Sequence, residues 1–296
     1  MPRRPSLKEP LSRFDGKPEA FLKESGKAAK PVFLVTNNSQ HQTLPESSRR
    51  KRAKRALERQ LDYQKRKAQF VPGREPEIIR GMQRSAKRVR DLLESFKPID
   101  KDARVIEVGS GAHGLIFYFG AGCGIGVDPL AVSYASLFPQ WQRCVPTVAA
   151  FGERLPFADA TFDFVICDNV VDHAESPEMI VQELVRILVP GGMLYFTVNV
   201  HHGIYSVAAQ AHSAWKAGGL PFEVGPFADH TIHLTPTAAK RMFQNLPLRI
   251  LSEKHGIAEA KERARRQPPR HLGDRLKRMF YKNAVFELVA EKCKRL

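Results

Sequence analysis

Short apolar runs alternate with amphipathic stretches through the middle of the chain. Five of these runs are expected to form strands, near residues 103–108, 124–128, 145–149, 162–168 and 192–199. Helices are expected between them, most clearly from Pro177 to Leu188. Strands that alternate with helices in this way predict a doubly wound parallel α/β sheet. Two later apolar runs, near 248–253 and 283–291, are expected to be the last two strands.

The chain before this alternation has a different pattern. Residues 1–48 are rich in proline, serine, asparagine and charge, which predicts a mostly flexible segment. A basic helix is expected from Ser47 to Phe70, and a strongly amphipathic helix is expected to open at Pro76. Its apolar residues recur at i+3 and i+4 spacing: Ile78, Ile79, Met82, Val89, Leu92, Leu93 and Phe96. The predicted organisation is a basic, mostly helical N-terminal extension over 1–70 and a folded domain over 71–296.

Two longer insertions interrupt the C-terminal part of the domain. Residues 200–233 contain five histidines and a possible helix from Tyr205 to Ala217. Residues 255–282 are strongly basic and fall between the last two predicted strands. Between the insertions, Thr235 as N-cap and a proline at the next position predict a helix that extends to Asn245.

The segment from Val105 to Gly114 (VIEVGSGAHG) is the main candidate for chemistry. An apolar strand that runs into glycines and then into a short apolar helix, here Leu115 to Phe119, is typical of a nucleotide-binding turn. Glycine allows the backbone to approach a ligand that a Cβ atom would block. An ordinary tight turn between strand and helix is the alternative interpretation.

Two cofactors fit this turn. Gly109, Gly111 and Gly114 match the G-x-G-x-x-G dinucleotide fingerprint, and Asp128 ends the next apolar run where an acid would hold a ribose hydroxyl. That pattern favours a nicotinamide or flavin enzyme. The other cofactor is S-adenosylmethionine, which has a ribose and an adenine but no pyrophosphate. Glu107 suits this cationic ligand and would repel a pyrophosphate.

Further motifs follow in a fixed order. They are GIGVDPL at 124–130, GERLPF at 152–157 followed by FDFV at 162–165, DNVVDH at 168–173, and the helix at 183–188 followed by VPGGML at 189–194. Together with the glycine turn, these motifs resemble the class I S-adenosylmethionine-dependent methyltransferases, specifically the methyltransferase type-11 group. The resemblance covers roughly residues 100–254. It implies a Rossmann-like, doubly wound sheet of seven strands, six parallel and one antiparallel.

The same resemblance implies a set of cofactor-binding residues. They are Glu107, Gly109, Ser110, Gly111, Asp128, Pro129, Glu153, Arg154, Asp168 and Asn169. Asp128 is expected to accept from both ribose hydroxyls, and Glu107 to orient the amino-acid end directly or through the backbone. Candidate bases are His173, which follows the fourth strand, and then His202 and His230. No metal site is expected.

The sequence departs from the family pattern at two places. His113 occupies the position of the third glycine of the usual D/E-x-G-x-G-x-G motif, and Gly114 comes one residue later. The acid that often contacts the adenine amine would fall near Phe151, which leaves Glu153 or the neighbouring backbone for that contact.

The distribution of charge suggests a partner. The chain has a net charge of +16, but residues 100–250 contain nine Lys/Arg and fourteen Asp/Glu and so carry −5. The remaining residues therefore carry +21. Basic flanks of this kind are expected to recruit an anionic acceptor, an anionic membrane surface or a nucleic acid.

These observations narrow the function. We expect S-adenosylmethionine-dependent methyl transfer to a small-molecule or lipid-linked acceptor. A nucleic-acid (RNA) methyltransferase is the alternative, although N-P-P-[YFW] and Pro-Cys signatures are absent. A nicotinamide-dependent oxidoreductase is a weaker alternative. The scattered cysteines, the N-terminus without an apolar core and the lack of about 18 consecutive apolar residues favour a cytoplasmic protein, with peripheral membrane attachment as a variant.

Overall fold

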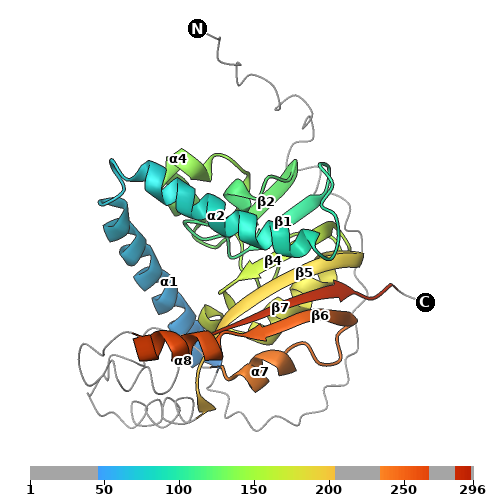
Figure 1. Ribbon diagram of the computed structural model, residues 1–296. Coiled ribbons are helices and arrows are strands. Elements are labelled where there is room, and N and C mark those ends of the chain that lie inside the picture. The colour runs from blue at the N-terminus through green and yellow to red at the C-terminus, as the bar shows by residue number, and fades with distance from the viewer. Residues whose placement is uncertain (1–45, 204–233, 267–283, 295–296) are drawn as a thin grey trace.

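The computed structural model describes residues 46–203, 234–266 and 284–294 of the chain. The predicted helix from 205 to 217 and His230 lie outside these residues. Figure 1 shows one twisted sheet with helices packed around it. None of the described helices is long and apolar enough to cross a membrane.

The sheet has seven strands in the order β3-β2-β1-β4-β5-β7-β6. Their bounds are β1 Arg104–Val108, β2 Cys123–Val127, β3 Thr147–Val148, β4 Phe162–Asp168, β5 Leu188–Val200, β6 Leu248–His255 and β7 Ala284–Lys292. The first five strands pair in parallel, and β7 is antiparallel to both of its neighbours. The predicted doubly wound sheet of six parallel strands and one antiparallel strand is confirmed.

Strand β5 begins four residues earlier than the expected start at 192. Leu188 pairs with Phe162 and Met193 pairs with Phe164, so the four residues of β5 between these pairs lie opposite a single residue of β4. Gly191, with φ +77°, lies in this bulge and accommodates a backbone conformation that other residues avoid. The proline and glycines at 190–192 therefore lie inside the strand, where the sequence predicted a turn before it.

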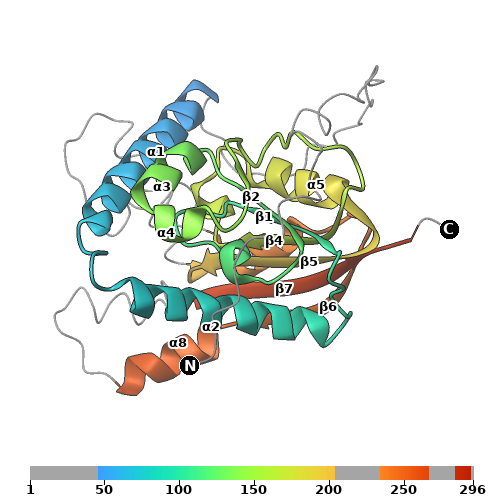
Figure 2. The ribbon, with the colours of Figure 1, turned by 90° about the horizontal axis from the view of Figure 1, so that it is seen from above.

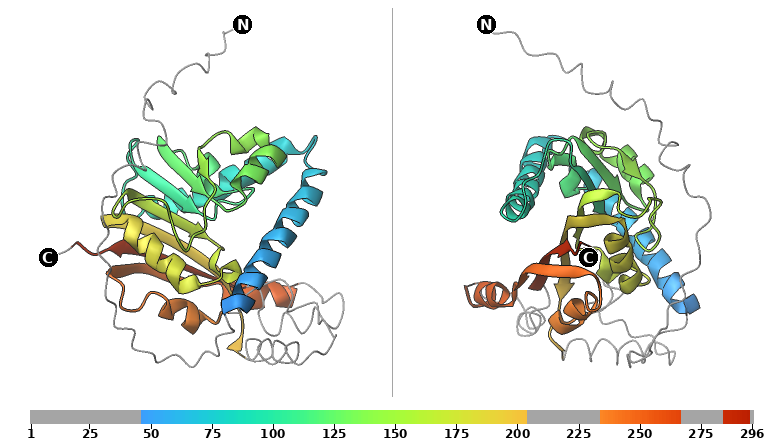
Figure 3. Two further views of the ribbon diagram at one scale, coloured as in Figure 1. Left: turned by 180° about the vertical axis from the view of Figure 1, so that it is seen from behind. Right: turned by 90° about the vertical axis from the view of Figure 1, so that its right-hand side faces the viewer.

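Helices cover both faces of the sheet, and each face has its own apolar core (Figures 1 and 3). On one face, α2 (Glu75–Glu94) packs through Met82, Ala86, Val89 and Leu93. On the other face, α5 (Pro177–Ile187) and α7 (Pro236–Arg241) cover the strands. The remaining elements are η3 (Leu115–Tyr118), α3 (Ala131–Leu137), α4 (Pro139–Gln142), η4 (Val171–His173) and α8 (Ile257–Arg266).

Helix α1 (Glu46–Ala68) is the predicted basic helix, and its bounds agree with the expectation to within two residues. It runs obliquely beside the strand ends and contacts α3 (Figures 1 and 2). Ala68 and Val71 join the apolar core on the α2 side. The C-terminal end of α1 is therefore packed against the domain.

The N-cap predicted at Thr235 is confirmed, because its Oγ1 accepts from the Ala238 backbone N–H at 3.1 Å. The helix ends at Arg241 rather than Asn245. Asn245 has φ +64°, a left-handed conformation that the chain uses to turn toward β6.

Candidate functional site

The candidate site lies at the carboxyl ends of β1, β2 and β4. These strands are neighbours in the sheet, so the acids at or near their ends, Glu107, Asp128 and Asp168, come to the same edge. In an open α/β sheet this edge is where ligands bind.

Glu107 is buried, with only 2% of its surface exposed. One carboxylate oxygen, Oε2, accepts from the Ile116 backbone N–H at 2.8 Å and so stabilises the start of η3. Burial raises the pKa of Glu107 to about 8, repulsion from Asp168 and Asp128 adds to the rise, and the hydrogen bond from Ile116 opposes it. Glu107 is thus poised to ionise when a cation arrives.

Gly114 lies directly beneath this carboxylate. A Cβ atom there would be 2.5 Å from Glu107 Oε2 and 2.4 Å from the Ser110 carbonyl oxygen. No side chain fits without displacing one of them. Gly114, which comes one residue later than the third glycine of the family motif, is therefore required by the packing of Glu107.

Gly109 and Gly111 shape the turn in different ways. Gly109 has φ +78°, and a Cβ atom on it would be 2.2 Å from Val170 Cγ2, so it is required for packing against the segment after β4. Gly111 has φ +54°, and the nearest atom to its missing Cβ is 3.9 Å away. Gly111 therefore leaves space beside the backbone that a ligand could use.

Asp128 ties the end of β2 to the glycine turn. Its Oδ2 accepts from the Gly111 N–H at 3.0 Å and its Oδ1 accepts from the Leu130 N–H at 2.8 Å. Burial raises the pKa of Asp128, while these two hydrogen bonds lower it. Each carboxylate oxygen retains a lone pair, so the predicted contacts with two ribose hydroxyls are compatible with these bonds.

The side chain of Ser110 points into the fold. A Cβ atom at Gly126 would be 2.8 Å from Ser110 Oγ, and the Ser110 backbone N–H donates to the Val127 carbonyl at 3.0 Å. Any cofactor contact from Ser110 would therefore involve its backbone. Pro129 lies between Asp128 and Leu130 at the start of α3 and is partly exposed.

The predicted adenine residues follow β3. Glu153 Oε1 accepts from the backbone N–H groups of Glu175 at 3.0 Å and Ser176 at 3.4 Å, so it anchors the entry to α5. Arg154 donates its backbone N–H to the Phe151 carbonyl at 3.2 Å. The Glu153 carboxylate is thus partly committed to the fold, and its cofactor role stays a prediction.

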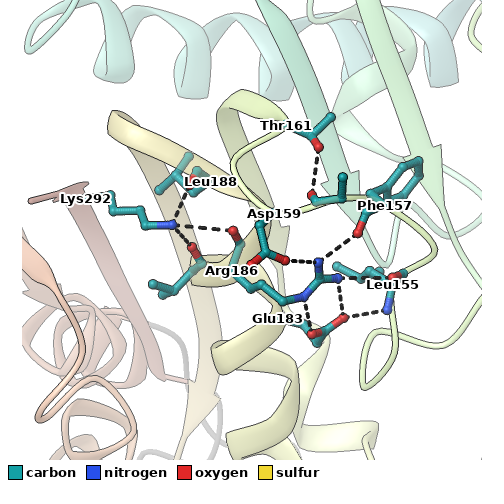
Figure 4. Close-up of polar contacts among 10 residues, drawn as sticks. Leu155, Phe157, Asp159, Thr161, Glu183, Arg186, Leu188 and Lys292 are labelled. Carbon is teal, nitrogen blue, oxygen red and sulfur yellow. Dashed lines mark hydrogen bonds and ion pairs between the residues drawn. The ribbon is translucent and has the colours of Figure 1, made fainter. Parts of the chain in front are cut away.

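A polar network holds the Leu155–Phe157 segment (Figure 4). Glu183 accepts from the Leu155 N–H at 2.7 Å, and Arg186 donates to the Phe157 carbonyl at 2.8 Å and the Leu155 carbonyl at 3.1 Å. Arg186 also pairs with Glu183 at 2.6 Å and Asp159 at 2.8 Å. This network fixes the backbone on which the predicted adenine residues lie.

Asp168 and Asn169 join the ends of β4 and β5. Thr197 Oγ1 donates to Asp168 Oδ1, and the Asn169 N–H donates to the Thr197 carbonyl at 3.1 Å. Asn169 has φ +57°, a conformation that asparagine tolerates better than most residues, and its Oδ1 accepts from the Asn199 N–H at 3.2 Å. Both residues therefore lie at the edge predicted for them.

The candidate bases follow β4 and β5. His173 ends η4, and its side chain lies outside the described part of the structure. His202 is partly exposed just beyond β5. Two residues that the sequence did not single out, Asp172 and His201, are fully buried at the same edge, and Asn199 Nδ2 donates to Asp172 Oδ2 at 3.5 Å.

The sequence also did not predict the role of α4. Trp141 Nε1 donates to the Ala112 carbonyl at 2.7 Å, and Gln142 Nε2 donates to the carbonyls of Gly111 at 3.0 Å and Ala112 at 3.1 Å. The His113 ring packs 5.0 Å from Phe138 and 5.2 Å from Trp141 between ring centroids. The histidine in place of the third glycine therefore fills an aromatic pocket under the turn.

Burial keeps His113 uncharged. It lowers the pKa of His113 to about 4, and the nearby positive charge of Lys67 lowers it further. Among the described residues, Glu107, Asp128 and Asp168 make no ion pair. Within the part of the chain that the structure describes, the edge therefore presents acidic side chains that no basic side chain pairs with.

Comparisons with known proteins agree with this geometry. A family model described as a methyltransferase domain matches residues 106–196. A malonyl-[acyl-carrier protein] O-methyltransferase from Enterobacter lignolyticus is 31% identical over 132 residues, which cover 44% of this chain and 51% of the relative. A thiol S-methyltransferase from Rattus norvegicus is 28% identical over 129 residues, covering 40% and 52%. The chain spans about half the length of the curated relatives it matches.

Solved structures show the same fold. A geranyl diphosphate methyltransferase in complex with geranyl diphosphate and sinefungin has a TM-score of 0.51 at 14% identity, covering 70% of this chain and 78% of that one. The predicted resemblance to the S-adenosylmethionine-dependent methyltransferases is confirmed, and S-adenosylmethionine is the cofactor of that family.

Proposed function

We propose that this chain, which carries the methyltransferase domain of the class I S-adenosylmethionine-dependent family, transfers a methyl group to a small-molecule or lipid-linked acceptor. The observation that carries the proposal is the group of carboxylates at the ends of β1, β2 and β4. Glu107, Asp128 and Asp168 lie at one edge and make no ion pair among the described residues.

This charge distribution discriminates between the two cofactors. S-adenosylmethionine carries a sulfonium and an ammonium, which complement buried carboxylates. A dinucleotide would place a pyrophosphate beside Glu107, which is mostly protonated at pH 7; the pyrophosphate would oppose its ionisation, whereas a cation favours it. The oxidoreductase alternative therefore finds no support at this site.

Methyl transfer from a sulfonium requires few catalytic side chains. S-adenosylmethionine supplies a methyl group on a sulfonium, which leaves as a neutral thioether when the acceptor atom attacks in line. The protein contributes alignment of the reactants and exclusion of water, and such effects can supply about 7–11 kcal/mol. The rigid turn clamped by Asp128, Trp141 and Gln142 suits this role.

A general base is needed only if the acceptor carries a proton that must be removed. His202 and His173 are the candidates from the sequence, and the buried Asp172 and His201 lie at the same edge. A positioned base contributes about 10²- to 10⁴-fold. The relatives' names include both O- and S-methylation, so the acceptor atom differs between proteins of similar sequence.

The second candidate function is methylation of a nucleic acid, RNA in particular. The described part of α1 supports it with an exposed set of cations: Lys54, Arg55, Arg59, Lys65, Arg66 and Lys67. The same cations would also serve a lipid-linked acceptor at an anionic membrane surface. Filter binding with RNA and co-sedimentation with anionic vesicles, run side by side, distinguish the two partners, because salt weakens the attraction to both.

The acceptor can be sought directly. Purified protein is incubated with methyl-labelled S-adenosylmethionine and, in separate reactions, with an extract of small metabolites, anionic lipid vesicles and total RNA. Label in the metabolite or lipid fraction supports the first candidate, and label in RNA supports the second. No label in any fraction, with cofactor binding intact, would contradict the proposal that this chain alone is an active transferase.

A further inference from the structure

Helix α1 presents two different faces. On its inner face, Leu57 and Leu61 are partly buried on the same side as Ala68, which packs against an apolar core of the domain. The Gln60 side chain hydrogen-bonds Tyr134 of α3, the helix that α1 contacts. The aliphatic residues of the described part of α1 are therefore already used for packing.

A row of alternating cations and aromatic rings follows another side of α1. Arg59, Tyr63, Arg66 and Phe70 succeed one another at spacings of four, three and four residues, which brings neighbours together on a helix. Phe70 comes just after the last residue of α1, and its N–H donates to the Lys67 carbonyl at 3.0 Å, so the chain is still turning there. All four side chains of the row are exposed.

The exposure of the two rings is the informative part of this row. Tyr63 is 52% exposed and Phe70 is 68% exposed. Only four tyrosine, phenylalanine or tryptophan side chains are exposed among the described residues, and two of the four lie in this row. Aromatic rings in water leave a large apolar surface unused. Rings that alternate with guanidinium groups therefore indicate a ligand with flat apolar surfaces and negative charge.

The charge around the row complements a polyanion. Residues 54–70 contain six Lys/Arg and two Asp/Glu, and so carry +4. One of the two acids, Asp62, lies 3.8 Å from the ammonium of Lys65, and both side chains are largely exposed to solvent. A surface of one dominant sign attracts ligands of the opposite sign and speeds their association.

The distribution of apolar residues separates a nucleic acid from a membrane as the partner. A helix that lies in a membrane interface buries a broad apolar face in the lipid. The aliphatic residues Leu57 and Leu61 of α1 are turned toward the domain, and only two rings, separated by Arg66, remain exposed. Bases of a single strand stack on isolated aromatic rings while cations between the rings contact the phosphates. The row therefore favours a single-stranded nucleic acid.

We infer that the row formed by Arg59, Tyr63, Arg66 and Phe70 is a binding face for single-stranded nucleic acid. Bases stack on Tyr63 and Phe70, and the guanidinium groups of Arg59 and Arg66 contact the phosphates. Helix α1 runs beside the strand ends, so a strand bound along it passes close to the candidate site (Figures 1 and 2). The inference goes beyond the proposed function, because it assigns a binding face and no methyl acceptor.

Filter binding of an unstructured, labelled RNA of about twelve nucleotides tests this face. We expect Tyr63→Leu and Phe70→Leu, which keep an apolar side chain but remove the ring, each to weaken binding about fivefold or more. The salt dependence of both variants should equal that of wild type, because no cation is lost. Arg66→Gln should instead make the slope of log affinity against log salt shallower by about 0.7. RNA and single-stranded DNA of the same sequence should both bind more tightly than the duplex, because only unpaired bases stack on the rings.

Matched variants elsewhere on the surface control for these changes. Phe96→Leu replaces an exposed phenylalanine that follows α2, and Lys101→Gln replaces an exposed lysine before β1. Both should bind RNA as wild type does. Tyr63→Phe keeps the ring and should retain the wild-type affinity for RNA within about twofold.

Three results would overturn the inference. They are equal RNA binding by wild type, Tyr63→Leu and Phe70→Leu, tighter binding of the duplex than of the single strand, and co-sedimentation of wild type with phosphatidylserine vesicles in the absence of any RNA binding. The last result would assign α1 to a membrane. All variants should bind S-adenosylhomocysteine as wild type does, so a failed RNA experiment leaves the proposed function intact. Failure of wild type to bind S-adenosylhomocysteine would refute the proposed function and leave the RNA result unaffected.

Discussion

Glu107 provides a prediction that links the buried charge to the cofactor. In the free protein its pKa is raised to about 8, mainly by burial and then by repulsion from Asp168 and Asp128. A cationic ligand at this edge would favour the ionised carboxylate and return its pKa toward the ordinary value. Binding of S-adenosylmethionine should therefore release a proton from Glu107.

The magnitude follows from the two pKa values. A carboxyl of pKa about 8 holds roughly 0.9 of a proton at pH 7, and one of pKa about 4.3 holds almost none. Binding at pH 7 should release about 0.9 of a proton. The dissociation constant should fall about ninefold from pH 6 to pH 7 and about fivefold from pH 7 to pH 8.

Calorimetry measures this directly. Titrations at one pH in buffers of different ionisation enthalpy give the number of protons released. S-adenosylmethionine, which carries the sulfonium, should release more than S-adenosylhomocysteine, which does not. Glu107→Gln should abolish the release, because glutamine can still accept from the Ile116 N–H but has no proton to lose. Glu94→Gln, at the end of α2, is the control and should behave as wild type.

The same shift has a consequence for stability. A carboxyl whose pKa is raised on folding stabilises the native state least at high pH, so the contribution of Glu107 falls between about pH 4 and pH 8. Glu107→Gln should therefore raise the melting temperature of the free protein more at pH 8.5 than at pH 5. In the calorimetric experiment, proton release of the same size from wild type and Glu107→Gln would mean that a group other than Glu107 ionises on binding.

Three further predictions concern the surroundings of the site. Gly114→Ala should lower the free energy of unfolding by about 1–3 kcal/mol in urea denaturation and should weaken the binding of S-adenosylhomocysteine, because the new Cβ would lie 2.4 Å from the Ser110 carbonyl oxygen. Gly81→Ala is the control: nothing lies within 4 Å of its added Cβ, so it should raise the free energy of unfolding by about 0.5–1 kcal/mol. Arg186→Met should lower the free energy of unfolding by about 2–4 kcal/mol in the same assay, since it removes the ion pairs and carbonyl contacts of Figure 4; an unchanged denaturation midpoint would contradict that role. Asp128→Asn should weaken S-adenosylhomocysteine about tenfold or more by calorimetry, because only one amide oxygen remains for two backbone N–H groups; unchanged affinity would remove Asp128 from the site.

Patterns local in sequence predicted most of the fold. Strand β4 has the predicted bounds, because its apolar run is bounded by polar residues and buried on both faces. Strand β5 was predicted to start too late, because Gly191 and the bulge opposite β4 keep the glycines inside the ladder. A bulge depends on how a strand pairs with its neighbour, so the sequence of one strand alone does not predict it.

The sequence predicted the part of the site that the glycine turn and the neighbouring strand ends form. Glu107, Gly111 and Asp128 lie together because consecutive parallel strands bring their ends to one edge. The clamp by Trp141 and Gln142 was not predictable, since its hydrogen bonds join residues about thirty positions apart on a helix that has no glycine or charge signature. The burial of Gln64 in α1, of which only 6% is exposed, was equally hidden, because the residues around it in the sequence are mostly basic.

We expect the acidic edge to bind S-adenosylmethionine rather than a dinucleotide. Calorimetric titration of the wild-type protein with S-adenosylhomocysteine, with NAD in a parallel cell, separates the two cofactors. We predict tight, stoichiometric binding of S-adenosylhomocysteine and no heat beyond dilution with NAD. Binding of NAD without binding of S-adenosylhomocysteine would contradict it.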